Sequence, residues 1–298
     1  MTDWGFSSEG RVAVHGGTLW HGVCGDLRAD TPLLVIHGGP GMTHDYLHPL
    51  CALADKRPVI FYDQLDAGLS DRPNDPANWH VSRFLDEIDA LRSALGLDQL
   101  NLLGNSWCGT LAAAYAARRP LGLERLILSS PLIHTQTWIA DNAAHRADLP
   151  AETVAIMLEC EAQGRLSDPA YLDAVDMFYR RHLCRTDPWP ESVNQTFERM
   201  NEVCYAAMWG PNEFTCTGVL RDYDGTPGLP QIMAPTLVTC GRHDEATPQS
   251  TARFAAMIRG ARFEVIEDAS HMAFVERPEI YTSLLRSFLD ADQAGPAR

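Results

Sequence analysis

The sequence predicts an α/β fold, in which a mostly parallel, doubly wound sheet is interrupted by an inserted helical segment. Two apolar runs, at 32–39 and 58–64, lack the alternation of a half-exposed strand and are typical of strands buried on both faces. After them, residues 80–96 carry apolar side chains at helical spacing, and Gly96 ends the pattern. Strand and helix therefore alternate along the chain, as they do in doubly wound sheets.

The first part of the chain, residues 1–131, contains most of the expected sheet. A hairpin is expected at 11–14 and 18–25, and we interpret His-Gly-Gly at 15–17 as its turn. Beyond the elements already named, the pattern predicts a strand at 100–106, a helix at 107–119 and a strand at 123–130.

The pattern changes to helices alone between residues 132 and 230. The predicted helical stretches are 138–142, 151–164, 169–184 and 191–210. An insertion of about 100 residues is too long for a simple connection. Strand patterns return in 231–298, with strands expected at 236–240 and 261–268 and helices from Pro248 and at 278–290. We therefore expect a core built from 1–131 and 231–298, with 132–230 as a helical cap.

Composition and charge narrow the class of protein. Hydrophobic residues make up 45% of the chain and charged residues 21%, as in an ordinary globular protein. The formal net charge of -15 argues against nucleic-acid binding, which needs a basic surface. No apolar run approaches the roughly 18 residues of a membrane span, and the N-terminus lacks the features of a signal peptide.

The eight cysteines have neither CxxC pairs nor metal-ligand spacing, and several lie in apolar runs where a free thiol behaves as a small hydrophobe. Scattered cysteines favour a reducing compartment. We therefore expect a cytoplasmic protein with no metal and no cofactor. The sequence carries no pattern that indicates an oligomeric state.

Ser106 lies where the strand at 100–106 passes into the helix that follows it. Such a turn places the hydroxyl above the sheet and beside a helix N-terminus, where developing negative charge is favoured. The position is typical of a nucleophile and equally of a helix N-cap. This segment alone leaves both interpretations open.

Two further residues favour the nucleophile. Asp244 follows the strand at 236–240, and His271 follows the strand that ends near residue 268. Both therefore lie at the carboxyl ends of strands, where sites form in open α/β sheets. Either residue alone would be read as part of a surface loop. The order Ser106, Asp244, His271 instead predicts a catalytic triad, with the imidazole as base and the carboxylate orienting it.

An oxyanion site is expected in His-Gly-Gly-Pro-Gly at 37–41, directly after the first buried strand. Glycines there let backbone N–H groups approach a ligand closely. We assign the two donors to the amides of Gly39 and Trp107, since donors aimed at the developing charge carry much of catalysis. The alternative is an ordinary Gly-Pro turn, which the neighbouring triad makes less favoured.

A set of motifs spans nearly the whole chain: HGGPG (37–41), YDQ…GLSDRP (62–73), GNSW (104–107), MWGPNEF (208–214), GRHDEATP (241–248) and SHM (270–272). Together they resemble the proline iminopeptidase family of α/β-hydrolases. The resemblance implies the α/β-hydrolase fold with a helical cap, and a serine exopeptidase or amidase that releases an N-terminal residue, frequently proline. It also implies that Glu213 and Glu245 bind the free amino group of the substrate.

The sequence departs from the family pattern at two places. Cys108 occupies the first of the two glycine positions that follow the nucleophile, while Gly109 is retained. A cysteine nucleophile at Cys108 is conceivable, but a side chain two residues along should point elsewhere. Asp66 and Ala67 stand where the family usually has glycine and then cysteine or serine, which affects substrate detail more than reaction type.

We therefore expect a serine hydrolase that releases an N-terminal residue, proline or another small apolar one, from short peptides or amino-acid amides through an acyl-enzyme. One alternative is an esterase or lactonase of the same fold with no requirement for a free amine. A binding protein on a hydrolase scaffold is the other, and it would normally have lost a member of the triad.

Overall fold

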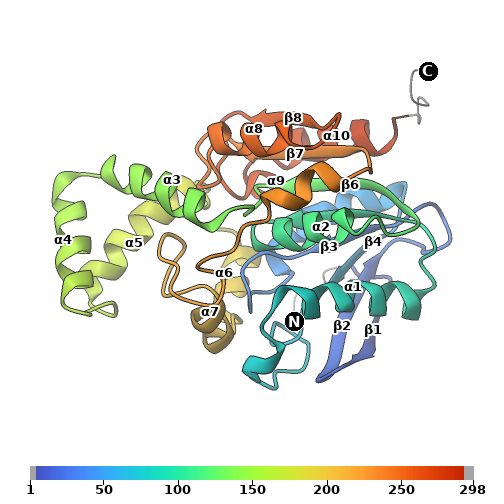
Figure 1. Cartoon of the computed structure of the whole chain (residues 1–298), viewed down its shortest axis with the longest axis horizontal. Helices are drawn as coiled ribbons and strands as arrows, with labels where there is room; N and C mark the ends of the chain where they lie inside the picture. Colours follow the sequence, from blue (N-terminus) through green and yellow to red (C-terminus); the bar gives the residue numbers. More distant parts are fainter. Residues whose placement is uncertain (1–4, 292–298) are drawn as a thin grey trace.

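The computed structural model describes residues 5–291 of the 298-residue chain, and an eight-stranded sheet forms its centre (Figure 1). The strands are β1 (Ser8–Val14), β2 (Gly17–Cys24), β3 (Leu33–Ile36), β4 (Val59–Tyr62), β5 (Leu100–Asn105), β6 (Leu123–Ser129), β7 (Thr236–Gly241) and β8 (Arg262–Ile266). They lie in the order β1-β2-β4-β3-β5-β6-β7-β8. The first two pairings, β1 with β2 and β2 with β4, are antiparallel, and the five that follow are parallel. The predicted doubly wound α/β fold is confirmed.

Helices cover both faces of this sheet. They are η1 (Asp45–Asp55), η2 (Pro76–Asn78), α1 (Val81–Leu95), α2 (Trp107–Ala117), α8 (Pro248–Ala256), α9 (Ala273–Glu276) and α10 (Pro278–Leu289). Successive side chains of β3 point to opposite faces of the sheet. Leu34 and Ile36 belong to a hydrophobic cluster that includes residues of α1 and α2 on one face. Leu33 and Val35 belong to a second cluster that includes residues of η1 and α10 on the other face. This two-sided burial is what the uninterrupted apolar runs of the sequence indicate.

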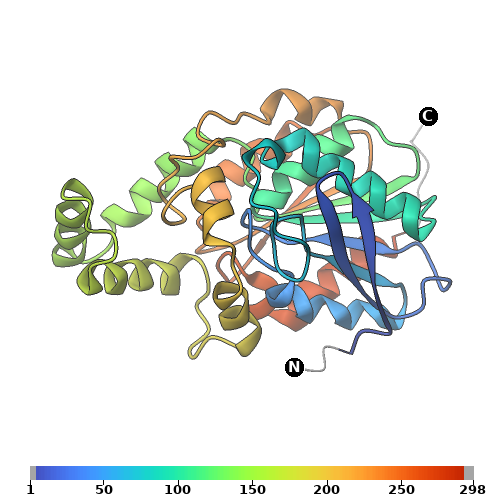
Figure 2. The ribbon, with the colours of Figure 1, turned by 90° about the horizontal axis from the view of Figure 1, so that it is seen from below.

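The chain between β6 and β7 is helical. It contains α3 (Thr135–Ala147), α4 (Ala151–Ala162), α5 (Pro169–His182), α6 (Glu191–Glu198), α7 (Glu202–Met208) and η3 (Thr226–Gln231). Helices α3, α4 and α5 extend away from the sheet, whereas α6 and α7 lie closer to it, with α6 packed on η1 (Figure 1 and Figure 2). Within residues 5–291, no helix is long and apolar enough to cross a membrane.

Two elements differ from the sequence prediction. The single helix expected at 191–210 is wrong: α6 ends at Glu198, and α7 begins after Asn201, whose side chain accepts a hydrogen bond from Cys204 N and so caps the new helix. The segment η1, which no pattern predicted, has Pro49 in its interior. Proline disfavours the interior of a regular α-helix, which accounts for the absence of a clear helical signal in the sequence.

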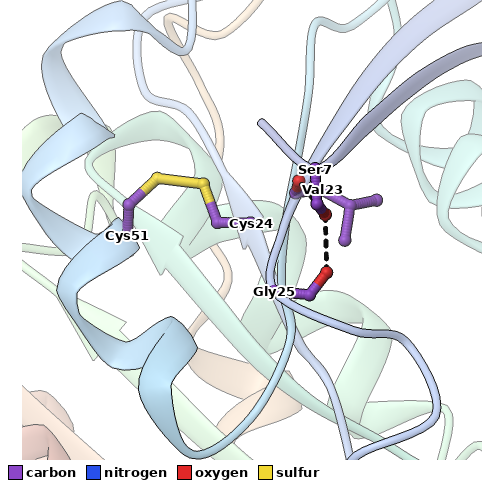
Figure 3. Close-up of a disulfide and its surroundings, with 5 residues drawn as sticks. All are labelled: Ser7, Val23, Cys24, Gly25 and Cys51. Atoms are coloured by element: carbon purple, nitrogen blue, oxygen red, sulfur yellow. Dashed lines mark hydrogen bonds between the residues drawn. A yellow bond between two sulfur atoms is a disulfide. The ribbon is translucent and has the colours of Figure 1, made fainter. Parts of the chain in front are cut away.

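The spacing of the cysteines did not indicate a disulfide, but the structure contains one. Cys24, at the end of β2, is joined by a disulfide to Cys51 in η1 (Figure 3). Close to this bond, Ser7 Oγ donates a hydrogen bond to the carbonyl of Gly25. The other six cysteines are free and buried, as the apolar context of their sequence positions indicates: Cys108, Cys160, Cys184, Cys204, Cys216 and Cys240.

Candidate active site

Ser106 sits in a sharp turn between β5 and α2, with a φ of 56° that non-glycine residues rarely adopt. The turn is held on both sides, because Ser106 N donates to the carbonyl of Ser129 and Leu132 N donates to the carbonyl of Ser106. The Ser106 side chain makes no capping hydrogen bond to α2. The hydroxyl is therefore not engaged as an N-cap, which was the alternative interpretation of this residue.

Close packing of α2 on β5 produces this turn. A Cβ atom at Gly104 would collide with the backbone of Cys108, and one at Gly109 would collide with Pro131. Only glycine lets the first turn of α2 approach the end of β5 and the chain that follows β6 so closely. The two glycines thus force the backbone bend that carries Ser106.

Asp244 and His271 form a hydrogen-bonded pair, with Asp244 Oδ1 2.8 Å from His271 Nδ1. Both residues are buried and follow the carboxyl ends of β7 and β8, as expected. Three donors fix the carboxylate: Ser130 Oγ at 2.6 Å, Gly241 N at 3.1 Å and Ala246 N at 2.8 Å. With Nδ1 held in this way, Nε2 is the imidazole nitrogen left to act on a substrate.

Ser106 and His271 line the same narrow cavity. No hydrogen bond joins them within the described residues, and His271 Nε2 instead lies 3.6 Å from Glu245 Oε1. Catalytic hydrogen bonds commonly tighten only when substrate is bound. The edge of the His271 ring packs against Trp138 of α3, with ring centroids 5.6 Å apart.

Gly38 and Gly39 of the loop at 37–41 also line the cavity, and one of the amides of this loop is already occupied. Gly38 N donates to Tyr46 Oη at 2.6 Å, and that hydroxyl donates to Asn105 Oδ1 at 2.6 Å. The amide of Gly39 donates to no other residue that the structure describes. Trp107 is the first residue of α2, so its amide has no carbonyl one turn earlier to bond. The two amides assigned from the sequence are therefore free to receive an oxyanion.

Glu213 and Glu245 are brought together beside this cavity. Glu213 lies in its lining, is buried, and accepts a hydrogen bond of 2.6 Å from Tyr205 Oη. Glu245 is fully buried, and neither of its carboxylate oxygens accepts a hydrogen bond from another described residue. Burial raises the pKa of Glu213, and burial together with Glu213 and Asp244 raises the pKa of Glu245 well above its usual range.

The departures from the family pattern have local explanations. Cys108 is completely buried, and its sulfur accepts a hydrogen bond from Gln64 Nε2 at 3.0 Å. Burial raises the pKa of this thiol well above its usual range, which disfavours the thiolate that a cysteine nucleophile needs.

Asp66 has a φ of 68°, a conformation that favours glycine. Its carboxylate compensates by accepting hydrogen bonds from Asn74 N and Trp79 Nε1. Ala67 is buried beside it and makes no side-chain hydrogen bond. The loop therefore keeps the backbone shape expected of glycine at position 66 while carrying an acidic residue.

Three residues of the site were not predicted: Tyr46, Ser130 and Trp138. Each acts on a partner far away in the sequence, at separations of 59 residues for Tyr46 and Asn105 and 114 for Ser130 and Asp244. No local pattern marks such contacts. Within residues 5–291, no group of three or more His, Cys, Asp or Glu side chains is placed to hold a metal ion.

Comparisons with known proteins agree with this fold and show the family. A family model described as the alpha/beta hydrolase fold matches residues 31–278. The proline iminopeptidase of Heyndrickxia coagulans is 38% identical over 285 residues, which cover 95% of this chain and 99% of that protein. Among solved structures, VinJ superposes with a TM-score of 0.93 at 38% identity, covering 96% of this chain and 99% of that one. The proline iminopeptidase of Mycobacterium smegmatis superposes with a TM-score of 0.89 at 38% identity, covering 95% and 98%.

Proposed function

This chain belongs to the proline iminopeptidase family of α/β hydrolases and is a hydrolytic peptidase, and we propose that Ser106, His271 and Asp244 carry out its reaction on substrates with a free amino terminus. The observation that carries the proposal is the pair of buried carboxylates, Glu213 and Glu245, beside the cavity that Ser106 and His271 share.

The reaction runs through an acyl-enzyme. His271 Nε2 takes the proton of Ser106 as its oxygen attacks the scissile carbonyl, and Asp244 stabilises the imidazolium that forms. The amides of Gly39 and Trp107 bind the oxyanion. His271 then protonates the leaving amine, and a water activated by the same imidazole hydrolyses the ester on Ser106.

Glu213 and Glu245 select the free amino terminus. An ammonium group placed between them favours the ionised carboxylates that burial otherwise opposes. At about 4 Å and an effective dielectric of about 20, one such pair contributes up to ~4 kcal/mol before desolvation reduces it. Holding the ammonium there fixes the scissile carbonyl one residue from the amino terminus, so the enzyme is an exopeptidase.

The cavity favours a small apolar residue. Besides the catalytic groups, its lining includes the side chains of Met42, Leu183 and Met272, all buried. Methionine and leucine offer no hydrogen-bond partner to a polar side chain, and methionine adapts to irregular shapes. Proline, whose ring is compact and apolar, fits this description, in short peptides or in amino-acid amides.

The test compares L-prolyl p-nitroanilide with its N-acetylated form. We expect the free substrate to have a kcat/KM at least about 100-fold higher, since acetylation removes the charge that the carboxylates bind. Glu213→Gln should lose much of this preference. Glu267→Gln is the matched control, because Glu267 is exposed and pairs with Arg242 at the surface. Equal turnover of both substrates would favour the esterase or lactonase alternative.

We also propose that the enzyme acts in the cytoplasm. Six buried free thiols support this location, because thiols persist under reducing conditions. The Cys24–Cys51 disulfide is the exception, because structural disulfides are rare in that compartment. Alkylation of intact cells followed by mass spectrometry measures the state of this pair, and a fully oxidised pair would point to an oxidising compartment and contradict the proposal.

A further inference from the structure

Three consecutive backbone carbonyls of the loop after β7 accept hydrogen bonds from side chains of the inserted helices. His182 Nδ1 lies 2.9 Å from the carbonyl oxygen of His243, His145 Nε2 lies 3.1 Å from that of Asp244, and Asn142 Nδ2 lies 3.3 Å from that of Glu245. This loop, which we call the acid loop (residues 242–247), carries the triad carboxylate and one of the two glutamates. Every carbonyl from 243 to 245 is therefore held by a side chain of α3 or α5.

The two histidine contacts fix the protons of both rings. A carbonyl oxygen only accepts, so His182 must carry its proton on Nδ1 and His145 must carry one on Nε2. Burial and the neighbouring His145 lower the pKa of His182 to about 4, so its ring is neutral at neutral pH. The two rings stack on each other, with centroids 4.0 Å apart and planes inclined by 21°.

The end of α5 also holds the loop that carries the triad histidine. His271 N donates to the carbonyl of His182 at 3.2 Å, and Met272 N donates to the carbonyl of Leu183 at 3.1 Å. His182 thus bonds the acid loop through its ring and the His271 loop through its backbone. His182 therefore connects the loop that carries Asp244 to the loop that carries His271. The distance between these two loops determines whether Asp244 and His271 can form their hydrogen bond.

We propose that His145 and His182, assisted by Asn142, are positioning residues that hold the acid loop and the His271 loop in the geometry that the reaction needs. This inference rests on the proposed function, since it assumes that Asp244 and His271 belong to the catalytic triad. None of the three side chains lines the cavity that Ser106 and His271 share, so they act through the loops. Misplacing a reacting group by about 1 Å lowers the rate by about 100-fold.

Isosteric substitutions separate this role from simple packing. The amide nitrogen of asparagine lies where Nδ1 of histidine lies, and that of glutamine lies where Nε2 lies. We expect His182→Asn and His145→Gln to keep kcat within about threefold of the wild type. The mismatched variants His182→Gln and His145→Asn, and leucine at either position, should lower kcat by about 10- to 100-fold with KM changed less than about threefold.

His134→Asn is the matched control, since His134 caps the same helix that carries His145 but the hydrogen bonds of its ring go to Thr137 and not to the acid loop. Its kcat should equal that of the wild type. Thermal unfolding of every variant separates stability from rate. The inference is overturned if the leucine variants keep wild-type kcat, or if matched and mismatched amides lose kcat equally and in step with their unfolding temperatures.

Labelling of Ser106 by a fluorophosphonate distinguishes failure of the positioning role of the histidines from failure of the proposed function. If Ser106 is labelled and Ser106→Ala is inactive while the histidine variants behave as wild type, only the positioning role is wrong. If Ser106→Ala retains full turnover, the triad itself is wrong, and the positioning role falls with it.

Discussion

The carboxyl group of Glu245 is the least compensated acidic group of the site, because it is fully buried and accepts no hydrogen bond from another described residue. Its raised pKa makes the ionised form costly to the folded state. A residue chosen for stability alone would not be acidic here. The chemistry of Glu245 is therefore better understood as preparation for a cationic substrate group than as support for the fold.

Glu245→Gln should stabilise the protein in a pH-dependent way while lowering activity on free amino substrates. Below the usual pKa of 4.5, the glutamate is protonated in both folded and unfolded states, so the substitution gains little. As pH rises above that value, only the unfolded chain ionises, and the wild type loses up to about 1.4 kcal/mol per pH unit until the raised folded pKa is reached. Urea unfolding at about pH 4, 5.5 and 7 measures the difference. A gain that is the same at each pH would contradict this interpretation.

Tyr46→Phe should damage catalysis more than its small change in volume suggests. The hydroxyl joins Gly38 N in the oxyanion loop to Asn105, the residue before the nucleophile. Its loss leaves two buried polar groups unpaired, at about 1–3 kcal/mol of unfolding free energy each, and frees the loop to move. We expect kcat to fall roughly 10- to 100-fold.

Tyr62→Phe is the control for this substitution, because Tyr62 is equally buried but its hydroxyl has no hydrogen-bond partner among the described residues. Its unfolding free energy should stay constant or rise, and its kcat should be unchanged. If Tyr46→Phe matched it in both measurements, Tyr46 would have no role in holding the oxyanion loop.

Among the contacts between secondary-structure elements, the packing of α2 on β5 sets the position of Ser106. Gly104→Ala places a methyl group against the backbone of Cys108, so we expect at least about 1–3 kcal/mol of destabilisation and a misplaced Ser106.

Cys108→Ala removes only the sulfur and its bond to Gln64, so most of the turnover should remain. Turnover and urea unfolding of both variants test this. An inactive Cys108→Ala that folds normally would point to a cysteine nucleophile.

Helices α1 and η1 show which helices the sequence pattern can predict and which it cannot. The helix at 81–95 was predictable because its buried face recurs at helical spacing and Gly96, with a φ of 66°, ends it. The segment η1 was not, because Pro49 breaks that pattern.

The same limit applies to the site. The positions of Ser106, Asp244 and His271 near one another were predictable, since each lies shortly after the carboxyl end of a strand. The side chains that hold the acid loop were not predictable, because His145 lies 99 residues from Asp244 and His182 lies 61 residues from His243. Only the folded chain brings them together.

At the scale of the whole molecule, the outer part of the inserted segment has a hydrophobic cluster of its own. Helices α4 and α5 pack around a small hydrophobic cluster that is separate from the two clusters flanking the sheet. In Figure 1 these helices project furthest from the sheet. In contrast, Leu183 and Val193 belong to the same cluster as β3 and η1, so the end of α5 and the start of α6 are tied to the core.

Hydrogen exchange should therefore reveal two levels of protection. We expect the amides of α4 to exchange well before those of β5, because a small separate cluster supports only local stability. Amides near Leu183 should follow the core, since the carbonyls of His182 and Leu183 accept hydrogen bonds from the amides of His271 and Met272. Exchange followed by mass spectrometry measures both. Protection of α4 as lasting as that of β5 would show that the whole chain opens as one unit.

The proposed mechanism predicts a covalent acyl group on one serine, formed only from substrates with a free amino terminus. The direct measurement mixes the enzyme with L-prolyl p-nitrophenyl ester or, in parallel, with its N-acetylated form. Each reaction is stopped after a short time, and the acylated peptide is identified by mass spectrometry. We expect the prolyl group on the peptide that contains Ser106, at a rate at least about 100-fold above that of the acetylated ester. A prolyl group on Cys108, or equal acylation by both esters, would contradict the proposed function.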